Sequence, residues 1–438
     1  MKSMRELALL IICEWEAEGK YINLAVNSHL LDGLSREERA SLTALLYTTV
    51  EKKLSYDYYI GALAKRSLDS IDARVLNILR LGACQVIDMK SIPAFAAVNE
   101  SVKLAKNPGE KAFINGVLRA IAARAENGDL PLPPYEKNPA RHLSVKYSLP
   151  LWIVKAFVSK LGEKEAEELF SSFNCDTGIT LTVNTLKISR EEFIRKLENQ
   201  GFSAEKSKLS ELSVKLFAKV NPKDLYGFEE GLFFVQDEAS ALSVLALAPK
   251  KNETLIDVCS APGGKSFSAA ILMENCGKIV SGDVRESKLS LIEGGAERLG
   301  LDSIEVIEND ATEIKQEYVG KFDKLICDVP CSGLGVISKK SDLRYRSEAG
   351  TLELPELQYR IISAASKYLK PGGEMVYSTC TLLDTENREV VERFLSDNPD
   401  FCRVDFNLGE LKSDGGTLTL YPHRNGTDGF FIAKLRKK

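Results

Sequence analysis

The chain has 438 residues, too many for one ordinary core, so two or three domains are expected. Hydrophobic residues make up 44% and charged residues 27%, which is ordinary for a soluble globular protein. The net charge of −4 neither indicates nor excludes a nucleic-acid partner, because charge can be segregated along a chain. Residues 1–125 carry 17 Lys and Arg against 14 Asp and Glu, so a basic surface is more plausible in this part.

The sequence indicates a cytoplasmic protein without a membrane span. The longest early apolar run, Leu7 to Cys13, is too short to cross a bilayer and lacks a signal-peptide cleavage pattern. The nine cysteines form no regular framework, which suits a reducing compartment. Because there is no C-x-x-C pair and the three histidines, His29, His142 and His423, are far apart, no metal site is expected.

The first 127 residues are predicted to form an all-α bundle. Apolar residues recur at helical spacing over 72–89, 93–107 and 111–126, and Asn107-Pro108-Gly109 separates the last two stretches. Residues 128–139 are rich in proline and glycine, which is typical of a linker. Residues 140–231 are predicted to be a small α+β adaptor. Strands are expected at 179–184 and 231–235, with a helix at 190–199 capped by Ser189.

From residue 232 to 438, strands alternate with helices, which favours a parallel, helix-covered Rossmann-like sheet. Strands are expected at 254–258, 278–282, 304–308, 324–327 and 374–378.

A glycine-rich turn follows the first of these strands. Gly263 and Gly264 let the backbone approach a ligand closely, and the helix that follows offers unpaired N–H groups. Asp283 ends the next strand, where it could accept from the hydroxyls of an adenosine ribose, and Asp310 ends the third, where it could accept from the adenine amino group. The alternative is a tight strand–helix turn without a ligand. The turn is not G-x-G-x-x-G, which argues against a dinucleotide and a dehydrogenase.

Two cysteines follow two later strands. Cys331 comes after the strand that ends near Asp328, and Cys380 directly follows the strand 374–378. If these strands are parallel neighbours, about 4.8 Å apart, both thiols emerge at the edge that holds the cofactor. Such a pair suits methylation of cytosine at C5: one thiolate adds to C6, and the other assists loss of the C5 proton. Asp328 could hold a proton on N3 of the base, which must first leave its stack.

The alternatives for Cys331 and Cys380 are small apolar core residues or a disulfide. The core interpretation is adopted for the seven other cysteines: Cys13, Cys84, Cys175, Cys259, Cys276, Cys327 and Cys402.

These motifs resemble those of the RNA cytosine-C5 methyltransferases (the RsmB/NOP family). The similar segments are Asp257–Lys265, Asp328–Ser332, Ser378–Cys380 and, as a closing strand, Gly426–Lys434. Upstream, Arg80–Gln85, Ile92-Pro93, Ala97–Val102 and Phe113–Arg119 resemble the helical NusB-like RNA-binding domain.

The resemblance implies methylation of a cytosine of 16S ribosomal RNA, at position 967, with S-adenosylmethionine as cofactor. The RNA partner would be an unassembled or partly assembled small subunit, and the enzyme would be a monomer. Position by position, Cys380 matches the nucleophile and Cys331 the residue that releases product, with Asp328 and Lys265 beside them. The matching cofactor contacts are Cys259, Ser260, Ala261, Pro262, Gly263, Gly264, Lys265, Asp283, Asp310 and Asp328.

Some assignments stay open at this point. Lys265 could stabilise a thiolate, hold an anionic group, or be a solvated surface lysine. Val329, Thr381 and the loop 338–346 depart from the family's pattern, although Asp342, Arg344 and Arg346 retain charge in that loop. We expect the loop to contact RNA phosphate, and His423 is a further candidate for facing RNA. The rival functions are a transfer-RNA methyltransferase and a non-catalytic RNA-binding or assembly factor.

Overall fold

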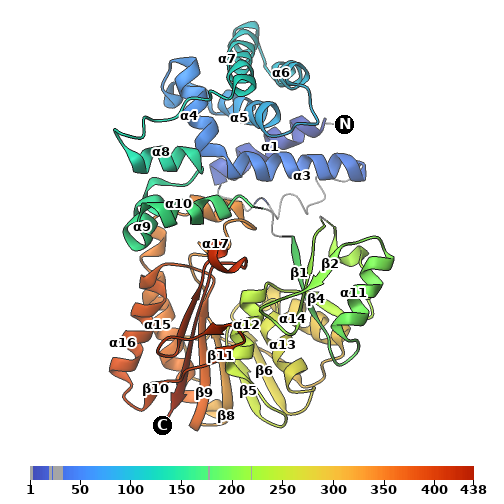
Figure 1. Cartoon of the computed structure of the whole chain (residues 1–438), viewed down its shortest axis with the longest axis vertical. Coiled ribbons are helices and arrows are strands. Elements are labelled where there is room, and N and C mark those ends of the chain that lie inside the picture. Colours follow the sequence, from blue (N-terminus) through green and yellow to red (C-terminus); the bar gives the residue numbers. More distant parts are fainter. Residues whose placement is uncertain (1–2, 19–21, 23–32, 176–177, 219) are drawn as a thin grey trace. The chain divides into compact units, whose positions relative to one another are not determined.

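The computed structural model describes residues 3–18, 22, 33–175, 178–218 and 220–438. His29 lies outside these residues. The chain forms two compact units (Figure 1). Unit 1 comprises Met1–Asn174 and Ile337–Tyr345, and unit 2 comprises Cys175–Val336 and Arg346–Lys438. A nine-residue segment from within the second half of the sequence thus belongs to the first unit.

Unit 1 is helical, as the periodicity predicts. Asp72 caps one helix by accepting from the N–H groups of Arg74 and Val75, and Asn107 caps another by accepting from Glu110. The helices are α1 (Met4–Glu18), α3 (Arg36–Glu51), α4 (Lys53–Ala64), α5 (Ala73–Ile87), α6 (Ala94–Lys103), α7 (Pro108–Asn127), α8 (Pro139–Lys146), α9 (Leu151–Leu161) and α10 (Glu163–Ser172). Helices α5, α6 and α7 pack on one another around a fully buried core. The three helices expected between residues 72 and 126 are confirmed.

The expected adaptor is divided between the units. Its helices α8, α9 and α10 belong to unit 1, whereas its strands belong to unit 2. Those strands form an antiparallel sheet in the order β2-β3-β1-β4, with the predicted helix α11 (Arg190–Asn199) packed on it and capped by Ser189. The strands are β1 (Ile179–Val183), β2 (Ala204–Lys206), β3 (Ser213–Leu216) and β4 (Phe233–Val235).

The large sheet of unit 2 has eight strands in the order β10-β14-β9-β8-β5-β6-β7, with β13 paired to β14. The five strands predicted from the sequence are all present and pair in parallel. They are β5 (Thr254–Asp257), β6 (Lys278–Asp283), β7 (Ile304–Glu308), β8 (Phe322–Asp328) and β9 (Leu369–Thr379). Antiparallel strands extend the sheet beyond β9: β10 (Phe401–Arg403), β13 (Thr417–Leu420) and β14 (Phe430–Lys437). A short hairpin of β11 (Asn407–Leu408) and β12 (Leu411–Lys412) and the helix α17 (Pro422–Asn425) complete this region.

Helices cover both faces of the large sheet (Figure 1). Because side chains alternate along a strand, Leu255 packs into one core and Ile256 into the other. The first core includes residues of α12 (Glu238–Leu247), α13 (Gly264–Leu272) and α14 (Glu286–Leu299), and the second includes residues of α15 (Leu354–Ala365) and α16 (Arg388–Asp397). Burial on both faces leaves the carboxyl ends of the parallel strands as the place where polar loops gather.

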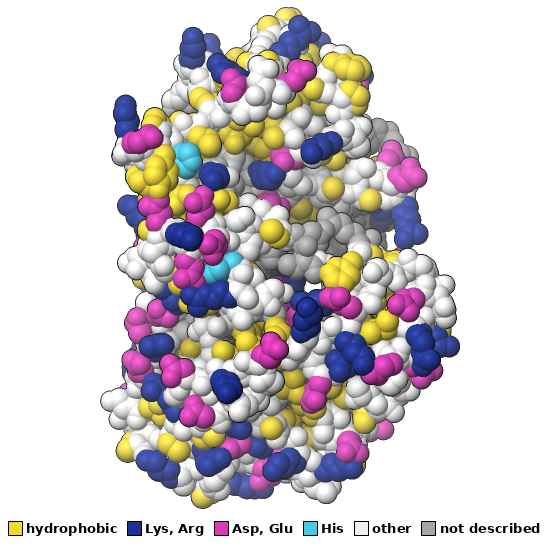
Figure 2. Space-filling view, viewed as in Figure 1, with side chains coloured by type: hydrophobic (Ala, Val, Ile, Leu, Met, Phe, Trp, Pro, Cys, Tyr) yellow, Lys and Arg dark blue, Asp and Glu magenta, His cyan; other side chains and the backbone are white. Residues whose placement is uncertain are grey.

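On the face drawn in Figure 2, Lys and Arg side chains are interspersed with Asp and Glu among the described residues. Of the helices in the described part of the chain, none is long and apolar enough to cross a membrane.

A cluster of charged side chains joins β8, β9 and β14 away from the carboxyl ends of the parallel strands. Glu374 on β9 accepts from Lys324 on β8 at 2.7 Å and from Arg436 on β14 at 2.6 Å, and Lys434 lies 3.2 Å away. Burial opposes ionisation of Glu374, but these cations outweigh burial and lower its pKa to about 2.

We predict that Glu374→Gln destabilises unit 2 in a pH-dependent way. A carboxyl whose pKa is depressed on folding stabilises the fold above its unfolded value, near 4.5, and loses that contribution as the pH falls toward 2. Urea unfolding at pH 7 should therefore show that the free energy of unfolding of Glu374→Gln is about 3 kcal/mol lower than that of the wild type. The difference should narrow as the pH falls below 4.5.

The matched control is Glu356→Gln, which breaks an exposed 2.6 Å pair with Arg393 and should change stability little at any pH. A loss for Glu374→Gln that stays constant between pH 7 and pH 3 would contradict the assigned ionisation.

Candidate active site

Cys331 and Cys380 meet at the carboxyl ends of two neighbouring parallel strands. β8 pairs with β9 in a register that places Asp328 opposite Ser378. Cys380 directly follows β9, and Cys331 lies three residues beyond Asp328. The two Sγ atoms are 3.2 Å apart, and both residues are free thiols that are half-buried. The predicted convergence of the cysteines is therefore present, without a disulfide between them.

The environment of Cys331 disfavours its thiolate. Sharing a hydrogen bond with Cys380, together with burial, raises the pKa of Cys331 well above its ordinary value. The nearby carboxylates Glu386 and Asp328 raise the pKa further. Cys331 is thus a neutral thiol at pH 7 in this state, able to donate its proton to Cys380.

Asp328 is held in place from two sides. Ser378 donates its hydroxyl to Oδ1 at 2.7 Å, and Lys265 donates from Nζ to Oδ2 at 2.6 Å. The Lys265 amino group also lies 5.3 Å from the centre of the Phe430 ring. Lys265 is only 9% exposed, so the interpretation as a solvated surface lysine is wrong. The Asp328 side chain stays 27% exposed, which leaves it accessible to a substrate.

A buried glutamate, Glu386, holds the loop that carries Cys331. It accepts from the backbone N–H of Ser332 and from the side chain of Gln358, each at 2.8 Å. Gln358 also donates to the carbonyl of Pro330 at 2.9 Å. Neither Glu386 nor Gln358 was singled out from the sequence. Both residues are distant from Cys331 in the sequence. The polar segment 384–387, which follows Cys380, is the feature of the sequence that could have indicated a role for Glu386.

The glycine-rich turn has the shape that the sequence predicts. Gly263 has φ of +109°, and α13 begins at Gly264. A Cβ at position 263 would lie 2.3 Å from Cζ of Phe267, so only glycine fits this turn. The backbone N–H of Ala261 donates to Asp283 Oδ2 at 3.2 Å, which joins the turn to the end of β6.

The two acidic residues at successive strand ends differ in exposure. Asp283 is 8% exposed and also accepts from the N–H of Arg285. Asp310 follows β7 and is exposed, and hydrogen bonds from the Thr312 hydroxyl and N–H lower its pKa. Asp310 therefore presents a carboxylate at neutral pH.

Asp257, the last residue of β5, lies fully buried behind the turn. The hydroxyl of Ser266 donates to its Oδ2 at 2.8 Å, and burial raises its pKa to about 7. Cys259, two residues later, has a pKa well above the ordinary value, because burial disfavours its thiolate. Its thiol is therefore protonated at neutral pH, and its backbone is the group that the turn offers to a ligand.

The expectation for the loop 338–346 needs correction. Arg344 is fully buried, so its side chain does not contact RNA phosphate. Arg346 donates to the backbone carbonyl of Cys331 at 2.9 Å, which directs it to the protein itself. Both residues are arginines, and arginine is usually exposed, so the sequence alone does not indicate that Arg344 is buried. His423 is partly exposed, beside Tyr421.

Three family models match the chain. The model for the 16S rRNA methyltransferase RsmB/F matches residues 244–436, the NusB family model matches 2–123, and a ferredoxin-like domain of RsmF/B-like methyltransferases matches 149–222. The ferredoxin-like match spans the division between the two compact units, so the domain boundaries drawn from the sequence stay a prediction.

Relatives match along the full length. The probable ribosomal RNA small subunit methyltransferase B of Bacillus subtilis is 36% identical, covering 100% of this chain and 99% of the relative. The corresponding protein of Synechocystis is 35% identical, covering 100% of both chains. The crystal structure of PH0851 has a TM-score of 0.78 and 28% identity, and covers 98% of this chain and 97% of its own. The chain therefore belongs to the RsmB/F family of S-adenosylmethionine-dependent methyltransferases.

Proposed function

We propose that the chain methylates carbon 5 of a cytosine in 16S ribosomal RNA through a covalent cysteine adduct. The observation that carries the proposal is the 3.2 Å approach of Cys331 and Cys380 beside Asp328, at the strand ends that also hold the glycine-rich turn. The small-subunit RNA substrate is supported by the names of the full-length relatives. Cytosine 967 is the expected target.

The residues of the turn fit S-adenosylmethionine. The first N–H groups of α13 suit its carboxylate, the Asp283 carboxylate suits the ribose hydroxyls, and Asp310 suits the adenine amino group. Residues Cys259 to Lys265 would hold it from the turn, with Asp328 at the reacting end. When bound, the cofactor supplies an electrophilic methyl group.

Cytosine C5 is a weak nucleophile, so the ring has to be activated first. Cys380, after losing its proton to solvent, forms a bond from Sγ to C6 of the cytosine. Electron density moves toward N3, which takes up a proton, and C5 becomes enamine-like. Asp328, fixed by Lys265 and Ser378, accepts a hydrogen bond from the protonated N3 or the N4 amino group.

Release of the product uses Cys331. Once Cys380 is bonded to C6, its sulfur no longer shares a proton with Cys331, and the principal cause of the raised Cys331 pKa is removed. Cys331 then loses its proton to solvent and takes the proton from the methylated C5. The electron pair of that C–H bond forms the C5–C6 double bond, the C6–S bond breaks with its electrons on Cys380, and the N3 proton returns to solvent.

Two rivals differ in what they would show. A transfer-RNA methyltransferase would use the same two cysteines on another RNA. A non-catalytic assembly factor would bind RNA without transferring a methyl group. The NusB family match over residues 2–123 supports RNA binding by the helical unit.

Gly263→Ala should weaken binding of S-adenosylmethionine at least about tenfold, because an L residue is strained at this φ and its Cβ would collide with Phe267. Isothermal titration calorimetry measures the effect. Gly294→Ala is the matched control, since no atom lies within 4 Å of a Cβ there. Equal affinities for the wild type and Gly263→Ala would remove the turn from the binding site.

Cys331→Ala should accumulate protein covalently joined to RNA, because addition by Cys380 is retained while loss of the C5 proton is blocked. The variant is incubated with cofactor and a 16S transcript containing cytosine 967, then run on a denaturing gel. The double variant Cys331→Ala, Cys380→Ala is the control and should give no adduct.

An absence of adduct, under conditions in which the wild type transfers methyl groups, would show that the cysteine roles are misassigned. An adduct with transfer RNA in place of the 16S transcript would favour the first rival. Failure of the wild type to methylate any RNA would favour the assembly factor.

A further inference from the structure

The loop after Cys331 leaves unit 2, contributes Ile337–Tyr345 to unit 1, and returns at Arg346. Both of its ends are bonded to the backbone of a proposed active-site cysteine. The N–H of Gly335 donates to the carbonyl of Cys380, and the Arg346 guanidinium donates to the carbonyl of Cys331, each at 2.9 Å. The middle of the same loop belongs to the helical unit.

Arg344 anchors this middle part deeply. Its side chain is fully buried, and it donates to the carbonyl of Glu51 at 3.0 Å, the carbonyl of Tyr147 at 3.5 Å and the amide oxygen of Asn174 at 3.4 Å. These acceptors are neutral, and burial lowers the pKa of the guanidinium. Removing a guanidinium from water toward neutral acceptors is costly. A loop needed only for connection would not require such a residue.

Tyr345 provides a second anchor beside it. Its hydroxyl donates to the carbonyl of Val50 at 2.7 Å, and its ring packs edge-on against Trp15 with centroids 5.7 Å apart. Burial raises the pKa of Tyr345 to about 12, so it stays a neutral donor. The next residue, Arg346, bonds to Cys331, so consecutive residues serve the helical unit and the active site.

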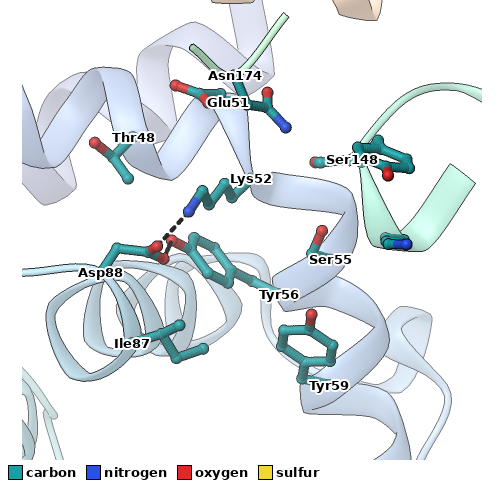
Figure 3. A pocket seen from close by; sticks show the side chains of 12 residues that line it. Thr48, Glu51, Lys52, Ser55, Tyr56, Tyr59, Ile87, Asp88, Ser148 and Asn174 are labelled. Atoms are coloured by element: carbon teal, nitrogen blue, oxygen red, sulfur yellow. Dashed lines mark hydrogen bonds and ion pairs between the residues drawn. The ribbon is translucent and has the colours of Figure 1, made fainter. Parts of the chain in front are cut away.

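The three residues that accept hydrogen bonds from Arg344 also line a pocket of unit 1, which has a volume of about 460 Å³. Figure 3 shows Glu51 and Asn174 close together, Ser148 apart from them, and Lys52 paired with Asp88. Arg344 bonds to Glu51 and Asn174, and the Tyr345 hydroxyl lies 3.5 Å from that of Ser148. The pocket and the loop therefore share part of their contacts, at Glu51, Tyr147, Ser148 and Asn174.

We propose that Arg346 is a positioning residue for Cys331, and that Arg344 and Tyr345 are positioning residues for the loop from which Arg346 extends. Arg344 and Tyr345 fix the loop in unit 1, and Arg346 holds the carbonyl of Cys331 so that its Sγ stays beside Cys380. The inference rests on the proposed role of Cys331 in product release. The carbonyl of Cys380 accepts a hydrogen bond from the N–H of Gly335 and not from Arg346. Addition of Cys380 to C6 should therefore depend less on Arg346.

The test separates methyl transfer from release in single-turnover reactions with the full chain and a 16S transcript. Arg346→Gln should transfer the methyl group at a rate within about twofold of the wild type but release RNA at least about tenfold more slowly, because small misplacements of a reacting group have large kinetic effects. Adduct containing methylated RNA should accumulate. Arg346→Lys retains a donor and should restore part of the release rate.

Tyr345→Phe keeps the ring packing and removes only the hydroxyl, so a smaller slowing of release is expected. Arg344→Lys removes the planar fork and should slow release more. Lys340→Gln, which removes an exposed charge from the same loop, is the matched control and should release RNA at the wild-type rate.

Release at the wild-type rate from Arg346→Gln, or from both Tyr345→Phe and Arg344→Lys, would overturn the inference. Slowing by Lys340→Gln equal to that by Arg346→Gln would also overturn it, since loss of loop charge would then explain the effect. Cys331→Ala is run beside these variants. If it traps adduct normally, the failure is of the inference alone; if it traps none, the proposed function fails first.

Discussion

The parallel pairing of β8 with β9 is the constraint on which the rest of the site depends. Its register places Asp328 opposite Ser378, and the loops that follow then bring Cys331 and Cys380 to 3.2 Å from each other. Burial of the sheet by helices on both faces fixes these strands, and the cluster around Glu374 ties β8, β9 and β14 together. A site built at the ends of such strands inherits their rigidity, which a pair of thiols needs if each is to act at a different step.

The charged residues beside the two thiols compensate one another. Lys265 is almost buried and its charge is compensated by Asp328, whose side chain stays partly exposed. The hydrogen bond with Cys380, together with burial, raises the pKa of Cys331 and keeps its thiol neutral. In the proposed mechanism one geometry serves addition and elimination in turn, because a bond from Cys380 to C6 would remove the hydrogen bond that Cys331 shares with it.

Much of this arrangement could be predicted from the sequence. Hydrophobic periodicity and turn residues located the helices of unit 1 and the five parallel strands, and parallel strands necessarily place Asp283, Asp328, Cys331 and Cys380 at one edge. The roles of Glu386 and Gln358 could not be predicted, because their contacts join segments that are distant in the chain. The burial of Arg344 was missed for a different reason. Charge predicts solvent exposure, and only the path of the loop into unit 1 provides the carbonyls that receive this guanidinium.

Attack at carbon 5 is the step that distinguishes the proposed chemistry from methylation of an exocyclic or ring nitrogen. It is tested most directly with a 16S transcript made from cytidine that carries tritium on C5, by counting tritium released to water and methyl groups incorporated by the wild type. One tritium released for each methyl group is expected, since the C5 proton has to leave before Cys380 is expelled. Incorporation of methyl groups with the tritium retained would contradict methylation at C5 and the roles assigned to both cysteines.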